Sequence, residues 1–112
     1  RSEYGPREAE MVQNRCLMTA ELFRALAHPQ RIRILELLRG RELCVCELMG
    51  SLRRPQAYVS QQLAVLRRAG LIVDRRQGTQ VYYRLADPSL HELLARAAKL
   101  GEGLESKLPI SV

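Results

Sequence analysis

The chain has 112 residues, a length that fits a single domain. Hydrophobic residues make up 46% of it, yet its aromatics are only four Tyr and one Phe, so aliphatic side chains must build the core, which favours packed helices. No apolar run approaches the roughly 20 residues that cross a bilayer, and the first residues do not resemble a signal peptide; we expect a cytoplasmic protein. The net charge of +6, from 18 Lys and Arg against 12 Asp and Glu, is typical of a protein whose partner carries phosphates.

The first part of the chain has a helical pattern. Residues 1–7 are polar and are expected to form a flexible arm, and a helix is predicted over residues 8–27. It carries two apolar stripes, formed by Val12, Cys16, Ala20, Phe23 and Ala27 and by Met11, Met18, Leu22 and Leu26. A helix that is apolar over most of its circumference needs burial on more than one side. In so small a protein, this pattern predicts a partner subunit.

Three shorter helices are expected next. Pro29 suits the first turn of the second helix, which Gly40 closes. A third helix is predicted from about Cys44 to Leu52, and a fourth from Pro55 to Arg68. On the fourth helix, the inward positions are Val59, Leu63 and Leu66, and the outward ones at its front end are Gln56, Ser60 and Gln61.

After Gly70 the period changes to that of strands. Residues 71–76 and 80–85 are rich in β-formers and flank Gln77-Gly78-Thr79, a pattern typical of a β-hairpin. Asp87 and Pro88 then precede an amphipathic last helix that runs to Leu100. We therefore predict one domain over residues 8–101 and a C-terminal tail over residues 102–112.

Two short helices, a tight turn and a basic hairpin predict a winged helix-turn-helix, a mainly α fold with a small β-hairpin. The second of these helices fits the major groove of duplex DNA, where amide side chains read base edges. A basic hairpin lies along the backbone or enters the minor groove, where the potential attracts Arg. The candidate DNA-binding residues are Gln56, Ala57, Ser60 and Gln61 on the helix and Arg75, Arg76 and Gln80 on the hairpin.

The three cysteines are Cys16, Cys44 and Cys46, an odd number that argues against a disulfide framework. Thiolates select soft, thiophilic ions. Residues two apart lie on nearly opposite sides of a helix, so Cys44 and Cys46 could share one ion only if the start of their helix were remodelled. A thiol redox switch and an inert structural role are the alternatives for this pair.

Enzymatic activity is not expected. A catalytic cysteine needs a base beside it, and the chain has only two His, neither of which any motif places. It also lacks a Gly-rich phosphate loop and a carboxylate pair with a chemical context. A DNA-binding protein without any inducer remains a further alternative.

Five segments together resemble the ArsR/SmtB regulators: LFRALAHPQRIRIL at 22–35, ELCVCEL at 42–48, VSQQL at 59–63, LRRAGL at 66–71 and YYRL at 82–85. The resemblance covers about residues 12–100 in collinear order. It implies a winged-helix homodimer, paired through its first and last helices, that binds operator DNA and is released by an inducer.

The same resemblance bears on the inducer. Arsenic-responsive members resembling this chain bind As(III) or Sb(III) through Cys-Val-Cys-Asp-Leu-Cys, but here Met49 takes the third place. Some members recruit a cysteine from the N-terminal region of the partner subunit, which makes Cys16 a tentative third ligand beside Cys44 and Cys46. Cd(II), Pb(II), an oxidant or a persulfide are alternative signals. The family's other metal site, on the last helix, is not expected here: Asp87 matches its first ligand, but Ser89 stands at the His position, and Leu100 and Gly103 stand where the later ligands should be.

Overall fold

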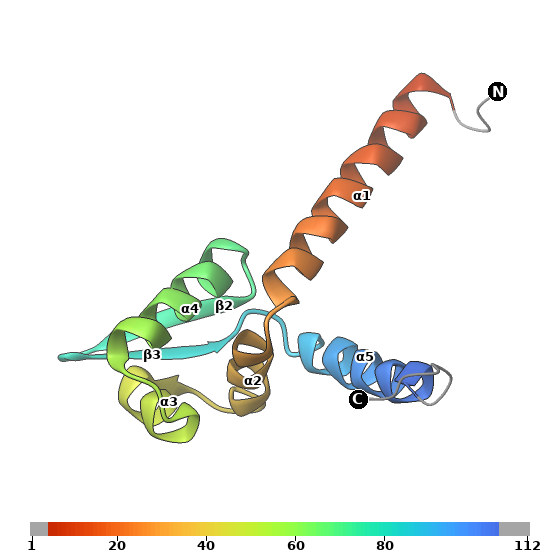
Figure 1. The fold of residues 1–112 in the computed structure, drawn as a ribbon. Helices are drawn as coiled ribbons and strands as arrows, with labels where there is room; N and C mark the ends of the chain where they lie inside the picture. Colours follow the sequence, from red (N-terminus) through yellow and green to blue (C-terminus); the bar gives the residue numbers. More distant parts are fainter. Residues whose placement is uncertain (1–4, 106–112) are drawn as a thin grey trace.

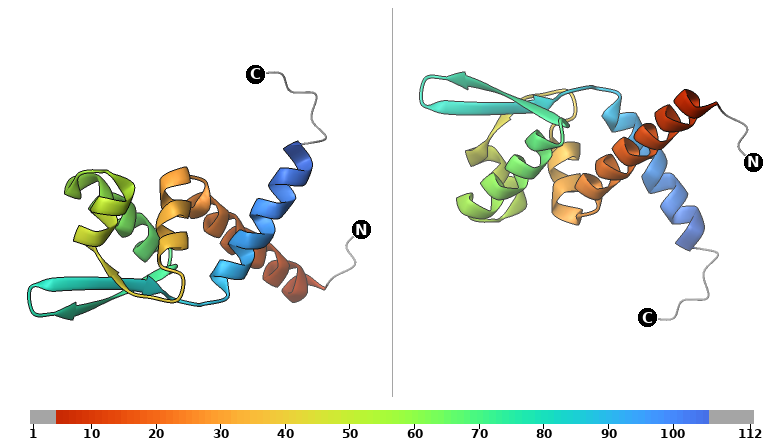
Figure 2. Two further views of the ribbon diagram at one scale, coloured as in Figure 1. Left: turned by 90° about the horizontal axis from the view of Figure 1, so that it is seen from below. Right: turned by 90° about the horizontal axis from the view of Figure 1, so that it is seen from above.

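The computed structural model describes residues 5–105 (Figure 1). Along the chain, the elements are α1 (Pro6–Leu26), α2 (Pro29–Leu37), β1 (Leu43–Cys44), α3 (Val45–Leu52), α4 (Gln56–Arg68), β2 (Ile72–Gln77), β3 (Gln80–Leu85) and α5 (Leu90–Glu105). The three middle helices and the sheet form a compact body, from which α1 and α5 project in different directions (Figures 1 and 2). The predicted mainly α fold with a small β-hairpin is confirmed.

The core lies where α2, α3 and α4 meet the base of the hairpin. Its side chains are almost all aliphatic, as the shortage of aromatic residues requires. The most deeply buried large side chains are Ile34 and Leu35 of α2, Leu38 directly after it, Leu48 of α3, Val59, Leu63 and Leu66 of α4, and Ile72 of β2. Each side chain of this size contributes roughly 1.5–3 kcal/mol when it is fully buried. The core therefore holds α3 and α4 in a fixed relation to the hairpin.

The sheet has one strand more than the sequence predicted. Its order is β1-β3-β2, with both pairings antiparallel, and β1 places Cys44 opposite Tyr82. The hairpin itself runs in register from Ile72 opposite Leu85 to Gln77 opposite Gln80. Its turn uses Gly78 at φ +64°, a left-handed conformation that suits glycine. The chain leading into α3 is thereby fastened to the hairpin at Cys44, the first of the two thiols.

Helix ends differ from the predicted ones at several places. α1 begins at Pro6 rather than at residue 8, because proline fits the first helical turn, where its missing N–H costs nothing. α5 continues to Glu105, through Gly101 and Gly103, where we predicted a tail from residue 102. Glycine inside a helix costs only about 1 kcal/mol relative to alanine, so it need not end one. Residues 1–4 and 106–112 of the predicted arm and tail lie outside the described residues.

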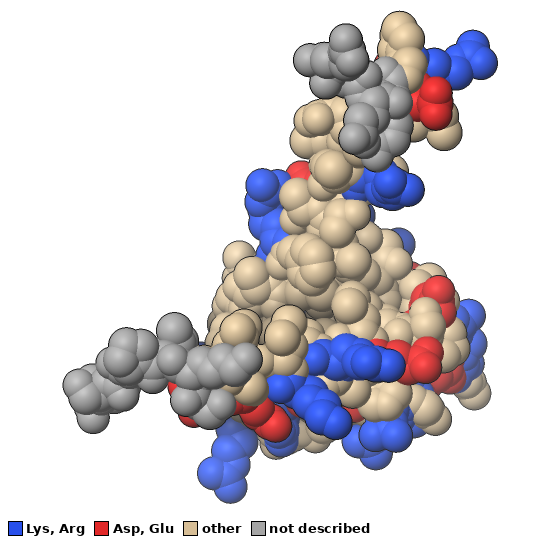
Figure 3. Space-filling model, turned by 90° about the vertical axis from the view of Figure 1, so that its right-hand side faces the viewer, with Lys and Arg blue, Asp and Glu red and all other residues tan. Residues whose placement is uncertain are grey.

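α1 leaves most of its apolar surface uncovered in the protomer. Only Ala25 and Leu26, at its C-terminal end, are buried. Met11 is 63% exposed, Met18 73% and Phe23 51%. Figure 3 shows largely uncharged surface that continues from the projecting α1 onto the body below it. Among the described residues, no helix combines the length and the apolar character needed to cross a membrane.

Candidate nucleic-acid interface

The front of α4 presents small and polar side chains to solvent. Val59, Leu63 and Leu66 fix its inner face, each at most 1% exposed. The candidate residues on its outer face are all exposed, as predicted: Gln56, Ala57, Ser60 and Gln61. Amides and hydroxyls on a projecting helix face are suited to hydrogen bonds with base edges.

Two arginines that we had counted only as charge lie directly before α4. Arg53 ends α3 in the left-handed conformation, at φ 55° and ψ 47°. The guanidinium of Arg54 lies over the ring of Tyr58, 4.8 Å from its centroid. Both are exposed and precede a helix N-terminus, where backbone N–H groups also favour anions. Their position between the two helices is the signal that could have marked them as candidate phosphate contacts.

The side chain of Arg75, in β2, is held in place by Glu42 and Tyr82. Its Nη2 donates to Glu42 Oε1 at 2.8 Å and its Nε to Oε2 at 3.1 Å, while its guanidinium lies over the ring of Tyr82. The hydrogen bond from Arg75 lowers the pKa of Glu42, and the same bond raises the pKa of Arg75. A charge engaged in this way has less freedom to meet a phosphate than the prediction assumed.

Arg76, the next residue, is in a different situation. It is exposed, and its backbone pairs with Val81 across the hairpin. Among residues 5–105, its side chain forms no ion pair or hydrogen bond. Of the two hairpin arginines predicted to bind DNA, Arg76 is therefore the one that can turn to a phosphate without breaking an internal contact.

The tip of the hairpin comes close to the front of α4. A cavity of about 220 Å³ is lined by residues from α3, α4 and the hairpin, among them Cys46, Gln56, Thr79 and Gln80. The structure thus brings together two predicted DNA-binding residues, Gln56 and Gln80, and one of the predicted thiol ligands. Gln56 and Gln80 thus line the same cavity although they are 24 residues apart in sequence, and Val45, Met49 and Val81 complete its lining.

The two cysteines of the Cys-Val-Cys motif differ in position and in exposure. Cys44 is buried, at 7% exposure, and is the N-cap of α3. Its backbone N–H donates to Glu47 Oε1 at 2.9 Å, and the hydrogen bonds from Cys44 lower the pKa of Glu47. Cys46, in the first helical turn, is exposed. The two thiols therefore lie in different surroundings, and the predicted conflict for a shared ion stays a prediction.

Cys16 does not join the pair within the protomer. It is exposed on α1, which projects away from the body that contains α3 (Figures 1 and 2). Over residues 5–105, no three side chains of His, Cys, Asp or Glu gather as a metal site.

Just before α5, the Asp87 carboxylate accepts hydrogen bonds from Ser89 N at 2.9 Å and Ser89 Oγ at 2.8 Å, which lower the pKa of Asp87.

Sequence comparison finds close relatives among bacterial regulators. Residues 28–73 match the family described as "Bacterial regulatory protein, arsR family". The chain is 50% identical over 84 residues to the uncharacterized HTH-type transcriptional regulator Rv0081 of Mycobacterium tuberculosis, covering 74% of each chain. It is 45% identical over 71 residues to the arsenical resistance operon repressor of Escherichia coli, covering 62% of this chain and 61% of that one.

Comparison of structures gives the same result. The crystal structure of M. tuberculosis Rv0081 superposes with a TM-score of 0.73 at 47% identity, covering 80% of this chain and 90% of that one. The homodimeric winged helix-turn-helix DNA-binding domain Mb0332 of Mycobacterium bovis gives 0.72 at 27% identity, covering 91% of each. These relatives are regulators with a DNA-binding winged helix and not enzymes. The chain belongs to the ArsR/SmtB family of winged helix-turn-helix transcriptional regulators.

Proposed function

We propose that this regulator is a homodimeric repressor of a metal(loid) resistance operon. In this proposal, α4 and the hairpin bind operator DNA, and a thiophilic ion, with As(III) or Sb(III) favoured, binds Cys44 and Cys46 and releases it. The observation that carries the proposal is the cavity that Cys46 lines together with Gln56 and Gln80. A structural change at Cys46 would therefore act directly on the surface that we propose reads DNA.

The DNA-binding part rests on the shape and charge of one face. α4 offers exposed Gln56, Ser60 and Gln61. Arg53 and Arg54 precede α4 in the chain, and the hairpin carries Arg76. In winged-helix proteins of this kind, base edges are read by the helix, while arginines meet the phosphates. We assign base contacts to the amides and phosphate contacts to the arginines.

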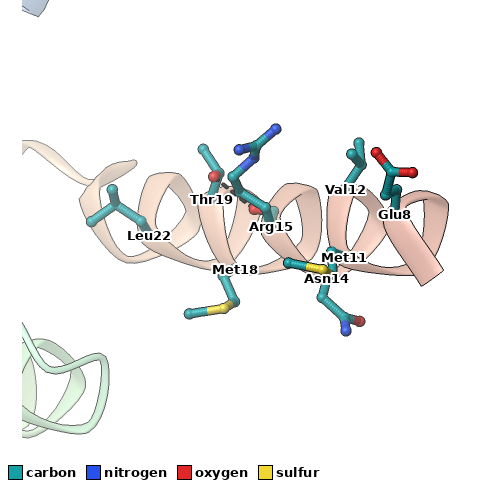
Figure 4. Close-up of a pocket in the computed structure, with 8 residues that line it drawn as sticks. All are labelled: Glu8, Met11, Val12, Asn14, Arg15, Met18, Thr19 and Leu22. Carbon is teal, nitrogen blue, oxygen red and sulfur yellow. Dashed lines mark hydrogen bonds between the residues drawn. The ribbon is translucent and has the colours of Figure 1, made fainter. Parts of the chain in front are cut away.

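The dimeric state is supported by the uncovered face of α1. A shallow groove there is lined by eight residues, with Met11, Val12, Met18 and Leu22 as its apolar members (Figure 4). Met11 and Met18 are seven residues apart, which places them on the same side of the helix, and both are exposed. A second copy of the chain, with α5 beside α1, is the proposed occupant. Mb0332, which has the same fold, is a homodimer. A two-fold dimer would match a pseudo-palindromic operator.

The release mechanism follows from the start of α3. Cys44 is the buried N-cap of α3 and Cys46 lies exposed in its first turn, so in this proposal one ion binds both sulfurs by opening that turn. Ligation also requires thiolates, and opening the turn would break the hydrogen bond from the Cys44 N–H to Glu47 Oε1. Because Cys44 is paired with Tyr82, opening this turn would disturb the hairpin as well as α3. An ion that binds the DNA-free form more tightly would thereby release the operator, and the coupling must be reciprocal.

The proposal can be tested with a duplex selected from random sequences by the protein itself. Cys44→Ser and Cys46→Ser should each bind this duplex like the wild type, measured by fluorescence anisotropy, but should not be released by arsenite or antimonite. Ser51→Ala, on the same helix, is a control that should respond normally. Equal release of the Cys44→Ser/Cys46→Ser double variant and the wild type would refute the thiol site and leave the DNA-binding function intact.

The same assay separates the alternative signals. Release by Cd(II) or Pb(II) but not by arsenite would assign a different soft ion to the pair. Release by peroxide or a persulfide donor, reversed by a thiol reductant, would indicate a redox sensor; the exposure of Cys46 makes this chemistry accessible. Cys16→Ser should weaken the response only if Cys16 of the partner subunit supplies a third thiolate.

A further inference from the structure

A second cavity, lined by neither of the paired thiols and by no residue of α4, has the features of a ligand site. Its volume is about 500 Å³, within the range of small-molecule sites. It lies where the segment after α2 meets the end of β3 and the start of α5, which begins beside α2 (Figure 1). The residues that line it are Leu38, Arg39, Gly40, Arg41, Glu42, Arg84, Leu85, Pro88 and His91.

Apolar side chains line part of this cavity. Leu38 is 1% exposed and Leu85 8%, so both belong to the core as well as to the cavity wall. Pro88, before α5, adds a rigid apolar side. An apolar group that entered here would therefore be held against the packed core, whose shape is already fixed.

The charge of the lining is strongly one-sided. Three arginines, Arg39, Arg41 and Arg84, face a single carboxylate, that of Glu42. That carboxylate is already engaged by Arg75 at 2.8 Å and lies 3.9 Å from Arg84. Within the described part of the chain, neither Arg39 nor Arg41 forms an ion pair. The Nε of Arg41 donates to the carbonyl of Leu37 at 2.8 Å, which anchors this side chain at the end of α2.

We propose that this cavity is a binding site for a small organic carboxylate with an apolar body. The carboxylate would pair with Arg39 and Arg41, since guanidinium groups bind carboxylates through two parallel hydrogen bonds. The apolar body would lie against Leu38, Leu85 and Pro88. His91, half-buried at the start of α5, can donate a further hydrogen bond. No cysteine and none of the candidate DNA-binding residues lines the site, so it would give the regulator a second kind of effector.

Benzoate is a suitable probe because it has one carboxylate and one small apolar ring. Isothermal titration of the DNA-free protein should show saturable binding of benzoate and none of neutral benzamide. Binding should be weakened about tenfold or more in the double variant Arg39→Ala/Arg41→Ala, which loses two charge-assisted pairings. The control Arg33→Ala/Arg96→Ala removes the same charge from exposed positions outside the cavity and should bind like the wild type. Thermal unfolding of both double variants checks that they fold.

Three results would overturn the proposal. One is the absence of benzoate binding to the wild type. Another is equal weakening in the two double variants, because binding would then reflect net charge alone. A third is inorganic phosphate binding as tightly as benzoate, because the apolar wall would then have no role. The Cys44→Ser/Cys46→Ser variant should bind benzoate unchanged, so failure of the thiol proposal can be told from failure of this one.

Discussion

Arg31 of α2 donates a hydrogen bond from its Nη1 to Oε1 of Gln62 on α4, at 3.0 Å. Its Nε donates to the carbonyl of Ala25 near the end of α1, at 2.6 Å. Gln62 is buried, at 7% exposure. One guanidinium therefore joins α1, α2 and α4. Since α1 carries the uncovered apolar face and α4 the exposed amides, this contact sets the angle between the proposed dimer surface and the proposed DNA surface.

Replacing Gln62 by leucine should destabilise the protein by about 1–3 kcal/mol, because the guanidinium of Arg31 then loses its acceptor in a partly buried place. Gln61→Leu is the matched control, since Gln61 is exposed on the same helix. It should alter the free energy of unfolding by less than about 0.5 kcal/mol. Urea denaturation measures both, and equal losses in the two variants would contradict the role assigned to Arg31.

On the DNA side, Gln61→Ala should weaken binding to the selected operator by about 1–3 kcal/mol if Gln61 makes a good base contact. Binding to an unrelated duplex should change little. Arg76→Ala should instead weaken binding to all duplexes and reduce the salt slope by roughly one unit, the value expected for one lost phosphate contact. Unchanged affinity in both variants, measured by anisotropy over a range of salt concentrations, would refute this placement of the DNA surface.

The ion pair of Glu42 with Arg75 should make stability depend on pH in acid. The pKa of Glu42 in the folded protein lies below its ordinary value of 4.5 because Arg75 hydrogen-bonds to the carboxylate. Its contribution is therefore complete above the unfolded-state pKa and is lost as the pH falls through the folded-state pKa. The wild type should melt higher than Glu42→Gln at neutral pH, and the difference should vanish in acid. A constant difference across this range would contradict the prediction. Glu36→Gln, an exposed position on α2, serves as the control.

Dimer formation can be tested at the groove of α1. Met18→Glu places a charge in the middle of the apolar face and should shift the protein towards monomer in light scattering at micromolar concentration. Gln13→Glu adds the same charge about 140° away around the helix and should leave more dimer than Met18→Glu. A wild type that is monomeric with and without DNA would contradict the dimer outright.

Local periodicity was sufficient to predict much of the fold. The spacing of Val59, Leu63 and Leu66 determined which side of α4 is buried and hence which side is exposed. The change to β-forming residues after Gly70 predicted the hairpin with its turn. These features depend on neighbours within a few residues, which is the range over which a sequence pattern is informative.

Features that depend on distant partners could not be predicted. β1 is two residues long, too short for any alternation, and it exists only because β3 lies beside it. The engagement of Arg75 depends on Glu42, 33 residues earlier in the chain. Nothing near Arg75 distinguishes it from Arg76, so both were assigned to DNA alike. The second cavity likewise arises where three separate segments meet.

The unequal exposure of Cys44 and Cys46 has a consequence for the timing of the proposed response. An ion arriving from solvent meets the exposed sulfur first and is then held by a single bond. Cys44 becomes available only when the first turn of α3 opens, an internal motion whose rate does not depend on how much ion is present. At high dose, the speed of derepression would therefore reach a plateau set by the protein. Above that dose, additional toxic ion would no longer shorten the delay before transcription begins.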